Sequence, residues 1–302
     1  MTELEKYFEP YRRNIVGIDT EIETPYGTKK LIYADWIASG RLYKPIEKRL
    51  FEDVGPMVGN THSESSATGK AMTDAYHLAQ KIVKRHANAN DSDILIFTGT
   101  GMTSAIAKLQ RMLGLKVPEQ AINYCVFTNG EYSNCKDIPN ENRPVVFLTH
   151  TEHHSNHTSW FETLADVVVL DPSPDLTLNT DSLRKEIIKY KDLPLLIGSF
   201  SAFSNVTGYM PPYYELARIM HENNGYCFID FAASAPYVDI DMHPAEKMEQ
   251  LDAIFFSPHK FLGGPGSAGV LIFNKELSRN ELTDSPGRGP GQCTNRWAGC
   301  RQ

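Results

Sequence analysis

Residues 253–264 read Ala253-Ile254-Phe255-Phe256-Ser257-Pro258-His259-Lys260-Phe261-Leu262-Gly263-Gly264, an apolar run that leads into a lysine and a glycine-rich turn. The first four residues have the length and composition of a buried strand. A surface lysine needs no explanation, but a lysine in an apolar, glycine-rich loop can be desolvated, which lowers its pKa and favours Schiff-base formation. Taken alone, Lys260 would still be interpreted as a surface residue, so its meaning depends on the rest of the chain.

Six other short apolar runs recur along the chain, and several are rich in β-branched residues. They are Asp93–Phe97, Val145–Thr149, Val167–Leu170, Leu195–Ser199, Tyr226–Asp230 and Ala268–Phe273. Segments with helical spacing lie among them, at Lys70–Ala87, Thr103–Leu113 and Pro212–Asn223. Strands that alternate with helices indicate an α/β fold, in which we expect a mostly parallel seven-stranded sheet with helices on both faces.

The composition indicates an enzyme-sized globular protein and argues against several other classes. The 302 residues carry a formal net charge of −7 without a Lys/Arg-rich run, which argues against a nucleic-acid surface. No apolar stretch approaches the roughly 18–20 residues of a membrane span, and the charged N-terminus lacks the apolar segment of a secretory signal. Five scattered cysteines without a CxxC pair suit a reducing compartment. We therefore expect a cytoplasmic protein with no membrane or nucleic-acid partner.

Polar residues follow the predicted strands at their carboxyl ends, where parallel sheets bind ligands. The turn Thr98-Gly99-Thr100-Gly101-Met102-Thr103-Ser104 leads into a helix, so its backbone N–H groups can bind a phosphate. It is neither a dinucleotide fingerprint, because Ser104 replaces the third glycine, nor a P-loop, and a plain glycine turn with a helix cap fits about equally well. Asp230 closes an apolar strand, where a carboxylate is costly to bury without a cation, although a helix cap or a salt bridge would also explain it.

Four histidines lie close together in His150-Thr151-Glu152-His153-His154-Ser155-Asn156-His157. His150, His154 and His157 would share one face of a helix, which invites a metal interpretation. The Thr, Ser and Asn residues disfavour a helix that begins at His150, and no carboxylate or cysteine cluster elsewhere completes a site. We therefore expect no metal, and a loop histidine that offers its ring to a ligand fits better.

These features together describe one site along one edge of the sheet. A phosphate-binding turn, a histidine ring, a buried aspartate and a lysine are parts that pyridoxal 5′-phosphate requires, for its phosphate, its ring and its aldehyde. A nucleotide-binding Rossmann protein is a competing interpretation, but the turn lacks its third glycine and the chain offers no convincing ribose-binding acid.

The sequence resembles the class V aminotransferase family, the fold-type I group that includes cysteine desulfurases, from about Tyr33 to Phe273, with every main motif in family order. The resemblance implies that Lys260 carries pyridoxal phosphate as a Schiff base and moves the proton at the substrate's α-carbon. It also implies that Asp230 pairs with the pyridinium nitrogen and that His153 stacks on the ring. These three are the candidate catalytic residues.

The resemblance implies a larger set of cofactor-binding residues, which includes Asp230 and Lys260. The others are Met102 and Thr103 at the phosphate with Ser257 and His259, Asn205 at the phenolic oxygen, and Ala232 under the ring. Asn60 and His62 lie where the family has an active-site loop. The sequence departs from the pattern at Ala233, where desulfurases commonly have a glutamine, and at Met102, which replaces the usual first threonine of the phosphate turn but keeps its N–H.

Three parts of the chain are expected: an N-terminal segment (1–30), the cofactor-binding large domain (31–284) and an atypical tail (285–302). The tail contains no Leu, Ile, Val, Asp or Glu, so we expect it to be disordered. The family continues with a smaller C-terminal domain that holds the arginine for the substrate carboxylate and, in desulfurases, the sulfur-accepting cysteine. We expect that domain to be missing, and hypothesise that the reading frame or gene model breaks near Gly287.

The resemblance implies a homodimeric, pyridoxal-phosphate-dependent enzyme that acts on a small amino acid, as an aminotransferase or a cysteine desulfurase. None of the five cysteines matches the sulfur-accepting position, and Cys293 and Cys300 lie in the atypical tail. The residues leave transamination, desulfuration, epimerisation and lyase chemistry open, with Arg41 or a partner subunit as speculative sources of the substrate-binding arginine. The alternative is a truncated, non-catalytic relative that binds cofactor or serves only as a partner subunit.

Overall fold

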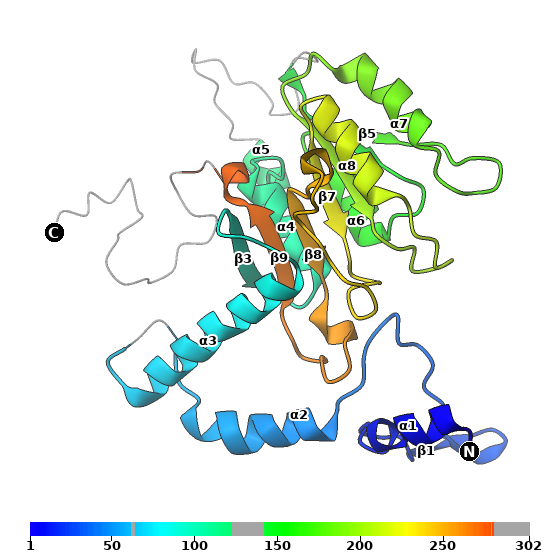
Figure 1. Ribbon diagram of the computed structural model, residues 1–302, viewed down its shortest axis with the longest axis vertical. Helices are drawn as coiled ribbons and strands as arrows, with labels where there is room; N and C mark the ends of the chain where they lie inside the picture. The colour runs from blue at the N-terminus through cyan, green and yellow to red at the C-terminus, as the bar shows by residue number, and fades with distance from the viewer. Residues whose placement is uncertain (62–63, 123–141, 279, 281–302) are drawn as a thin grey trace.

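The computed structural model describes residues 1–61, 64–122, 142–278 and 280, and Figure 1 shows the course of the chain. His62 of the expected active-site loop, the atypical tail from residue 285 onward and every cysteine except Cys227 lie outside the described residues. Within the described part, no helix is long and apolar enough to cross a membrane.

A seven-stranded sheet forms the centre of the molecule, in the order β3-β9-β8-β7-β6-β4-β5. Its strands are β3 (Asp93–Thr98), β4 (Val145–Leu148), β5 (Asp166–Val169), β6 (Leu196–Ser201), β7 (Tyr226–Asp230), β8 (Ala253–Phe256) and β9 (Gly269–Asn274). All seven predicted strands are confirmed, with ends displaced by no more than 2 residues. β9 runs antiparallel to both of its neighbours, and the pairs from β8 through to β5 are parallel, which confirms a mostly parallel sheet.

Side chains alternate along the strands between two apolar cores, one on each face of the sheet. In β4, Phe147 enters one core and its neighbour Leu148 enters the other, as the two-residue period of a strand requires. Helices cover both cores: α7 (Thr180–Ile187) and α8 (Tyr213–Glu222) lie on the first, and α4 (Met102–Met112) and α6 (His154–Phe161) on the second. The expected helices on both faces are therefore confirmed (Figure 1).

Side-chain caps explain where two helices begin. Helix α3 (Ala67–His86) starts three residues before the predicted Lys70, because the Ser66 hydroxyl accepts the N–H of Gly69 at 3.1 Å. Helix α6 begins at His154 rather than at His150, and its cap is the His153 ring, whose Nδ1 accepts the N–H of Ser155 at 3.1 Å. Of the histidine segment, residues 150–153 therefore precede the helix and residues 154–157 lie in α6.

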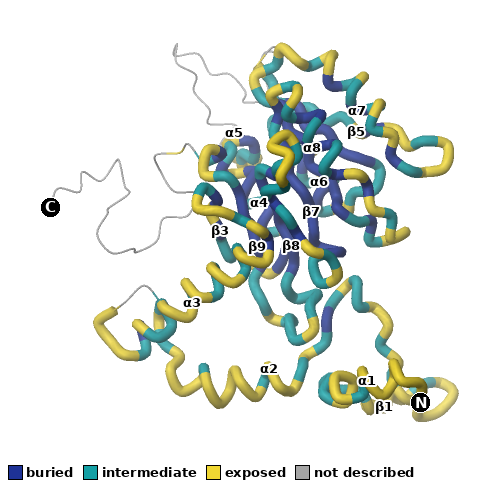
Figure 2. Tube along the Cα trace, in the orientation of Figure 1, coloured by how far each residue is buried: buried dark blue, intermediate teal, exposed yellow. Residues whose placement is uncertain are grey.

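The N-terminal part of the chain lies largely outside the two cores. It contains α1 (Glu3–Arg12), a hairpin of β1 (Glu21–Thr24) and β2 (Gly27–Lys30), and α2 (Lys44–Arg49). Exposed residues dominate these elements in Figure 2, whereas the central strands of the seven-stranded sheet are buried. Helix α5 (Glu119–Ile122) follows α4.

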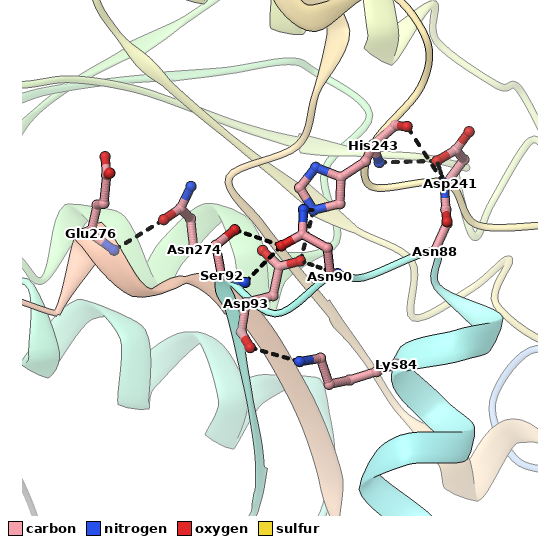
Figure 3. A network of polar contacts seen from close by, with 9 residues as sticks. All are labelled: Lys84, Asn88, Asn90, Ser92, Asp93, Asp241, His243, Asn274 and Glu276. Carbon is pink, nitrogen blue, oxygen red and sulfur yellow. Dashed lines mark hydrogen bonds and ion pairs between the residues drawn. The ribbon is translucent and has the colours of Figure 1, made fainter.

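A polar network lies at the start of β3, at the opposite end of that strand from the glycine turn (Figure 3). At its centre is the buried Asp93, whose Oδ2 accepts the N–H of Asn90 and contacts His243 Nε2, each at 2.7 Å. Asn88, at the end of α3, donates to Asp241 at 2.7 Å. The network therefore joins two segments, 88–93 and 241–243, that lie about 150 positions apart in the sequence.

Replacing Asp93 by alanine is expected to lower the free energy of unfolding by about 1–3 kcal/mol, because it leaves the Asn90 N–H and the His243 ring without their acceptor. Chemical denaturation measures the change. Asp91→Ala is the matched control, since Asp91 is exposed and its removal should cost within about 0.5 kcal/mol. Equal losses in both variants would contradict this role of Asp93.

Candidate functional site

A cavity of about 520 Å³ opens at the carboxyl ends of the parallel strands. The nine predicted catalytic and cofactor-binding residues line it: Met102, Thr103, His153, Asn205, Asp230, Ala232, Ser257, His259 and Lys260; Asn60 of the expected active-site loop is not among its lining residues. They come from the turns after β3, β4, β6, β7 and β8. The cavity thus lies where the sheet topology places a ligand.

The glycine turn between β3 and α4 forms one wall of the cavity. Gly99 has φ +53°, and a Cβ on Gly101 would stand only 2.9 Å from His259 Cε1. The ring of His259 is held against this turn, because its Nδ1 lies 3.0 Å from the carbonyl oxygen of Thr100, which can only accept a hydrogen bond. Glycine at position 101 therefore lets the lysine loop and the turn approach each other closely.

Two of the predicted phosphate-binding residues contact each other directly. The N–H of Met102, at the start of α4, donates to the Ser257 hydroxyl at 2.8 Å. This leaves the hydroxyl hydrogen of Ser257 available to an acceptor in the cavity. Thr103 is exposed, and its hydroxyl donates to Ser155 at 2.8 Å. An anion here would meet the Ser257 hydroxyl and the N-terminus of an 11-residue helix, of which Thr103 is the second residue.

His153 lies between β4 and α6 with its ring open to the cavity. Its pKa is lowered, first by burial and then by the positive charges of Lys260 and His154. Because Nδ1 accepts the N–H of Ser155, the proton of the neutral ring is on Nε2. At neutral pH the ring is therefore uncharged and can stack on a flat ligand.

Asp230 is 4 % exposed at the end of β7, and its Oδ1 accepts the N–H of Ala232 at 2.8 Å. Burial raises the pKa of its carboxyl to about 7; the Ala232 N–H opposes this rise, the charge of Glu152 adds to it, and the charge of Lys260 opposes it. Among the described residues Asp230 forms no direct ion pair, so a salt bridge is not the reason for its burial. It is a buried carboxylate that faces a cavity.

Lys260 occupies a short 3₁₀ turn, Pro258–Lys260, directly after β8. Burial lowers the pKa of its amine, and the charges of Asp230 and Asp35 only partly oppose this. In the described part of the chain, its Nζ has neither a hydrogen-bond nor an ion-pair partner. A partly desolvated amine of this kind is available as a nucleophile.

Asp35, Ser201 and Phe203 also line the cavity and were not predicted. Asp35 belongs to the N-terminal part, which reaches the site because Gly40 N–H donates to the carbonyl of His259 at 2.9 Å. A Cβ on Gly40 would stand 1.9 Å from the carbonyl oxygen of Phe261, so only glycine fits this crossing. Ser201 ends β6 and could have been found from its place at the carboxyl end of a strand.

The histidine segment does not gather a metal site. His150 Nε2 lies 2.9 Å from the carbonyl oxygen of Leu176, on a different segment. Across the described residues, no group of three or more histidine, cysteine, aspartate or glutamate side chains is placed to hold a metal ion.

Asp230→Asn tests the ionisation of this site in the cofactor-free protein. Asp230 has a folded-state pKa of about 7, against 3.8 ordinarily. Its contribution to the stability of the fold is therefore fully present below about pH 4 and is lost as the pH rises through 7. The stability of Asp230→Asn relative to wild type should therefore grow with pH, by at most about 4 kcal/mol between pH 4 and pH 8. Denaturation at several pH values measures this, with the exposed Asp239→Asn as control. A difference that does not change with pH would contradict the raised pKa.

Comparison with known proteins agrees with this geometry. Residues 134–283 match the sequence model of the family described as Aminotransferase class-V. The chain is therefore similar to the class V aminotransferases over about half of its length. It is 26% identical over 249 residues to a probable cysteine desulfurase of Halalkalibacterium halodurans, covering 81% of this chain and 53% of the relative. A probable cysteine desulfurase of Staphylococcus epidermidis is also 26% identical, over 265 residues, covering 86% of this chain and 56% of the relative.

Solved structures share the fold. The apo cysteine desulfurase of Thermococcus onnurineus superimposes with a TM-score of 0.64 at 20% identity, covering 89% of this chain and 57% of that one. A cysteine desulfurase of Escherichia coli gives a TM-score of 0.56 at 22% identity, covering 80% and 54%. The chain spans about half the length of the curated relatives it matches.

Proposed function

We propose that this chain is the cofactor-binding part of a pyridoxal-phosphate-dependent enzyme that acts on a small amino acid. The observation that carries the proposal is the pairing, in one cavity, of a desolvated lysine amine and a buried aspartate without a cation. The lysine amine can react with an aldehyde, and the aspartate can pair with a protonated ring nitrogen. Pyridoxal phosphate carries both groups. The proposed domain covers residues 31–284, with residues 1–30 as a separate segment.

The residues of the cavity fit this cofactor along its whole length. The α4 N-terminus, with Ser257 and Thr103, would hold the phosphate, in a turn where Gly101 leaves no room for a side chain. Asp230 would hold the ring nitrogen, with Ala232 and the neutral His153 on the two sides of the ring. Asn205, which also lines the cavity, would reach the phenolic oxygen. When bound, pyridoxal phosphate supplies an electron sink for the bonds at the amino acid's α-carbon.

Lys260 and Asp230 would each have a separate role in the reaction. Lys260 would hold the cofactor through its amine, and this amine would also accept or return the proton of the substrate's α-carbon. The lowered pKa of this amine makes its neutral form, the one that can act as a base, more populated than in an ordinary lysine. Asp230 would keep its negative charge next to the ring nitrogen and so hold the proton there.

Cysteine desulfuration is the first reaction to test, because the relatives of the chain are described as cysteine desulfurases. The cavity residues serve transamination equally well. The test incubates the cofactor-loaded chain with L-cysteine and with other small amino acids, and follows sulfide and keto-acid release together with visible absorbance. Spectral changes and product with at least one amino acid are expected. A chain that takes up the cofactor but changes with none of them would support the non-catalytic alternative.

We also propose that two copies of the chain associate. Helix α1 exposes Leu4, Tyr7, Phe8 and Tyr11, and the three rings contact one another, so they form an exposed apolar patch of the kind that marks an interaction surface. A second copy that covers them would also suit the resemblance to homodimeric enzymes. Sedimentation should give twice the chain mass, and a monomer at all concentrations would reject the proposal.

A further inference from the structure

Glu152, the residue before His153, is a second enclosed carboxyl beside the cavity. Its Oε1 accepts the Thr149 N–H at 3.3 Å and contacts the Thr149 hydroxyl at 2.7 Å. Its Oε2 accepts from Asn156 Nδ2 at 2.7 Å and contacts the Ser201 hydroxyl at 2.6 Å. All four partners are neutral, so an ionised Glu152 would be a buried charge without a counter-charge.

The directions of these hydrogen bonds are largely fixed. Asn156 cannot turn its amide, because its Oδ1 accepts from the Ser199 hydroxyl at 2.6 Å and from Trp160 Nε1 at 3.3 Å. Its Nδ2 must therefore donate to Glu152. The Ser201 hydroxyl, in contrast, can accept as well as donate. A proton on Glu152 Oε2 would thus go to Ser201 Oγ without breaking any contact.

Ser201 connects the two enclosed carboxyls. It is the register partner of Asp230 in the parallel pair β6–β7, so both side chains leave the sheet on the same face, and both line the cavity. Burial raises the pKa of Glu152, and the hydrogen bonds with Ser201, Thr149 and Asn156 oppose this rise; a charge on Glu152 would in turn raise the pKa of Asp230. Asp35, His153, His259 and Lys260 are the other ionisable groups that line the cavity, and among these only Lys260 opposes the rise of the Asp230 pKa. Because each carboxylate would raise the pKa of the other, the two groups do not ionise independently.

We propose that Glu152 is a positioning residue that stays protonated and donates its hydrogen to Ser201, so that the negative charge of the pair resides on Asp230. The use of that charge rests on the function proposed above. With Ser201 Oγ accepting from Glu152, its own hydrogen points toward the cavity, where it is a donor beside Asp230. The Glu152–Ser201 hydrogen bond thereby connects the loop that carries His153 to the end of β6 without adding a second negative charge.

Infrared spectroscopy of the cofactor-free chain tests the protonation directly. At pH 8 the wild type and Asp230→Asn are expected to show the carbonyl stretch of a protonated carboxyl, and Glu152→Gln is expected to lose it. If Asp230→Asn lost this band and Glu152→Gln kept it, the proton would be on Asp230 and the proposal would be overturned. A wild-type spectrum without the band would overturn it as well. Ser201→Ala removes the acceptor and should shift the band; an unmoved band would overturn the Glu152–Ser201 bond.

A second measurement in the cofactor-loaded chain uses the pH dependence of the visible absorbance. Glutamine replaces a neutral carboxyl by a neutral amide, so the midpoint in Glu152→Gln should stay within about 0.3 pH unit of the wild type. A fall of about one unit or more would mean that a negative charge was removed, which contradicts a protonated Glu152. If the wild type forms no visible absorbance at all, the proposed function fails, and the infrared result still decides the state of Glu152. If Glu152→Gln does not fold, the wild-type and Ser201→Ala infrared spectra decide it.

Discussion

Lys260→Ala is expected to abolish the visible absorbance that pyridoxal phosphate gives with the wild-type chain, and to lower turnover roughly 10³-fold or more. Lys260 Nζ is the partly desolvated amine in the cavity, so no other side chain in the described part can replace it there. Absorbance spectra after removal of free cofactor measure the first effect, and product release measures the second.

The matched control for this experiment is Lys275→Ala. Lys275 is exposed, at the far end of β9 from the cavity, and its removal should leave both the spectrum and turnover unchanged. An unchanged spectrum in Lys260→Ala would mean that the cofactor binds elsewhere, or only through surface lysines. Lys260 would then not be the residue that binds the cofactor.

Asp230→Asn is expected to lower turnover about 100- to 1,000-fold while cofactor binding survives. The amide can still accept the Ala232 N–H, but it carries no charge with which to hold a proton on the ring nitrogen. The electron sink is weakened, so the loss should fall on the rate of reaction more than on substrate binding. Stopped-flow measurement of the spectral change with amino acid separates the two.

Asp239→Asn serves as the control, because Asp239 is an exposed aspartate of the loop after β7. Its turnover should equal that of the wild type. If Asp230→Asn reacted as fast as this control, the carboxylate would have no electrostatic role, and its burial would need another explanation.

Much of this site could be predicted because parallel strands place their carboxyl ends at one edge. Three of the predicted strands show this: β3 ends shortly before Met102, β7 ends at Asp230, and β8 ends shortly before Lys260. Knowing the strands and their common direction was therefore enough to bring these side chains together, and no long-range contact had to be known. The antiparallel insertion of β9 between β3 and β8 does not disturb this, since β9 contributes no site residue.

The residues that were missed depend on contacts that the local sequence does not show. Asp35 reaches the cavity through the backbone contact of Gly40 with His259, which are more than 200 positions apart. Glu152 was seen as part of a histidine cluster, and only its contact with Ser201, from a different strand, shows that it is a buried carboxyl. The start of α6 depends on the ring of His153 as a cap, which is an unusual choice for that position.

Borohydride reduction followed by peptide mapping tests the central claim most directly. Reduction makes the bond between a lysine and bound pyridoxal phosphate permanent, and mass spectrometry then locates the modified residue. We predict one cofactor per chain, on Lys260, in the peptide that contains Ser257 and His259. Modification spread over exposed lysines such as Lys247 and Lys275, with Lys260 unmodified, would contradict the account.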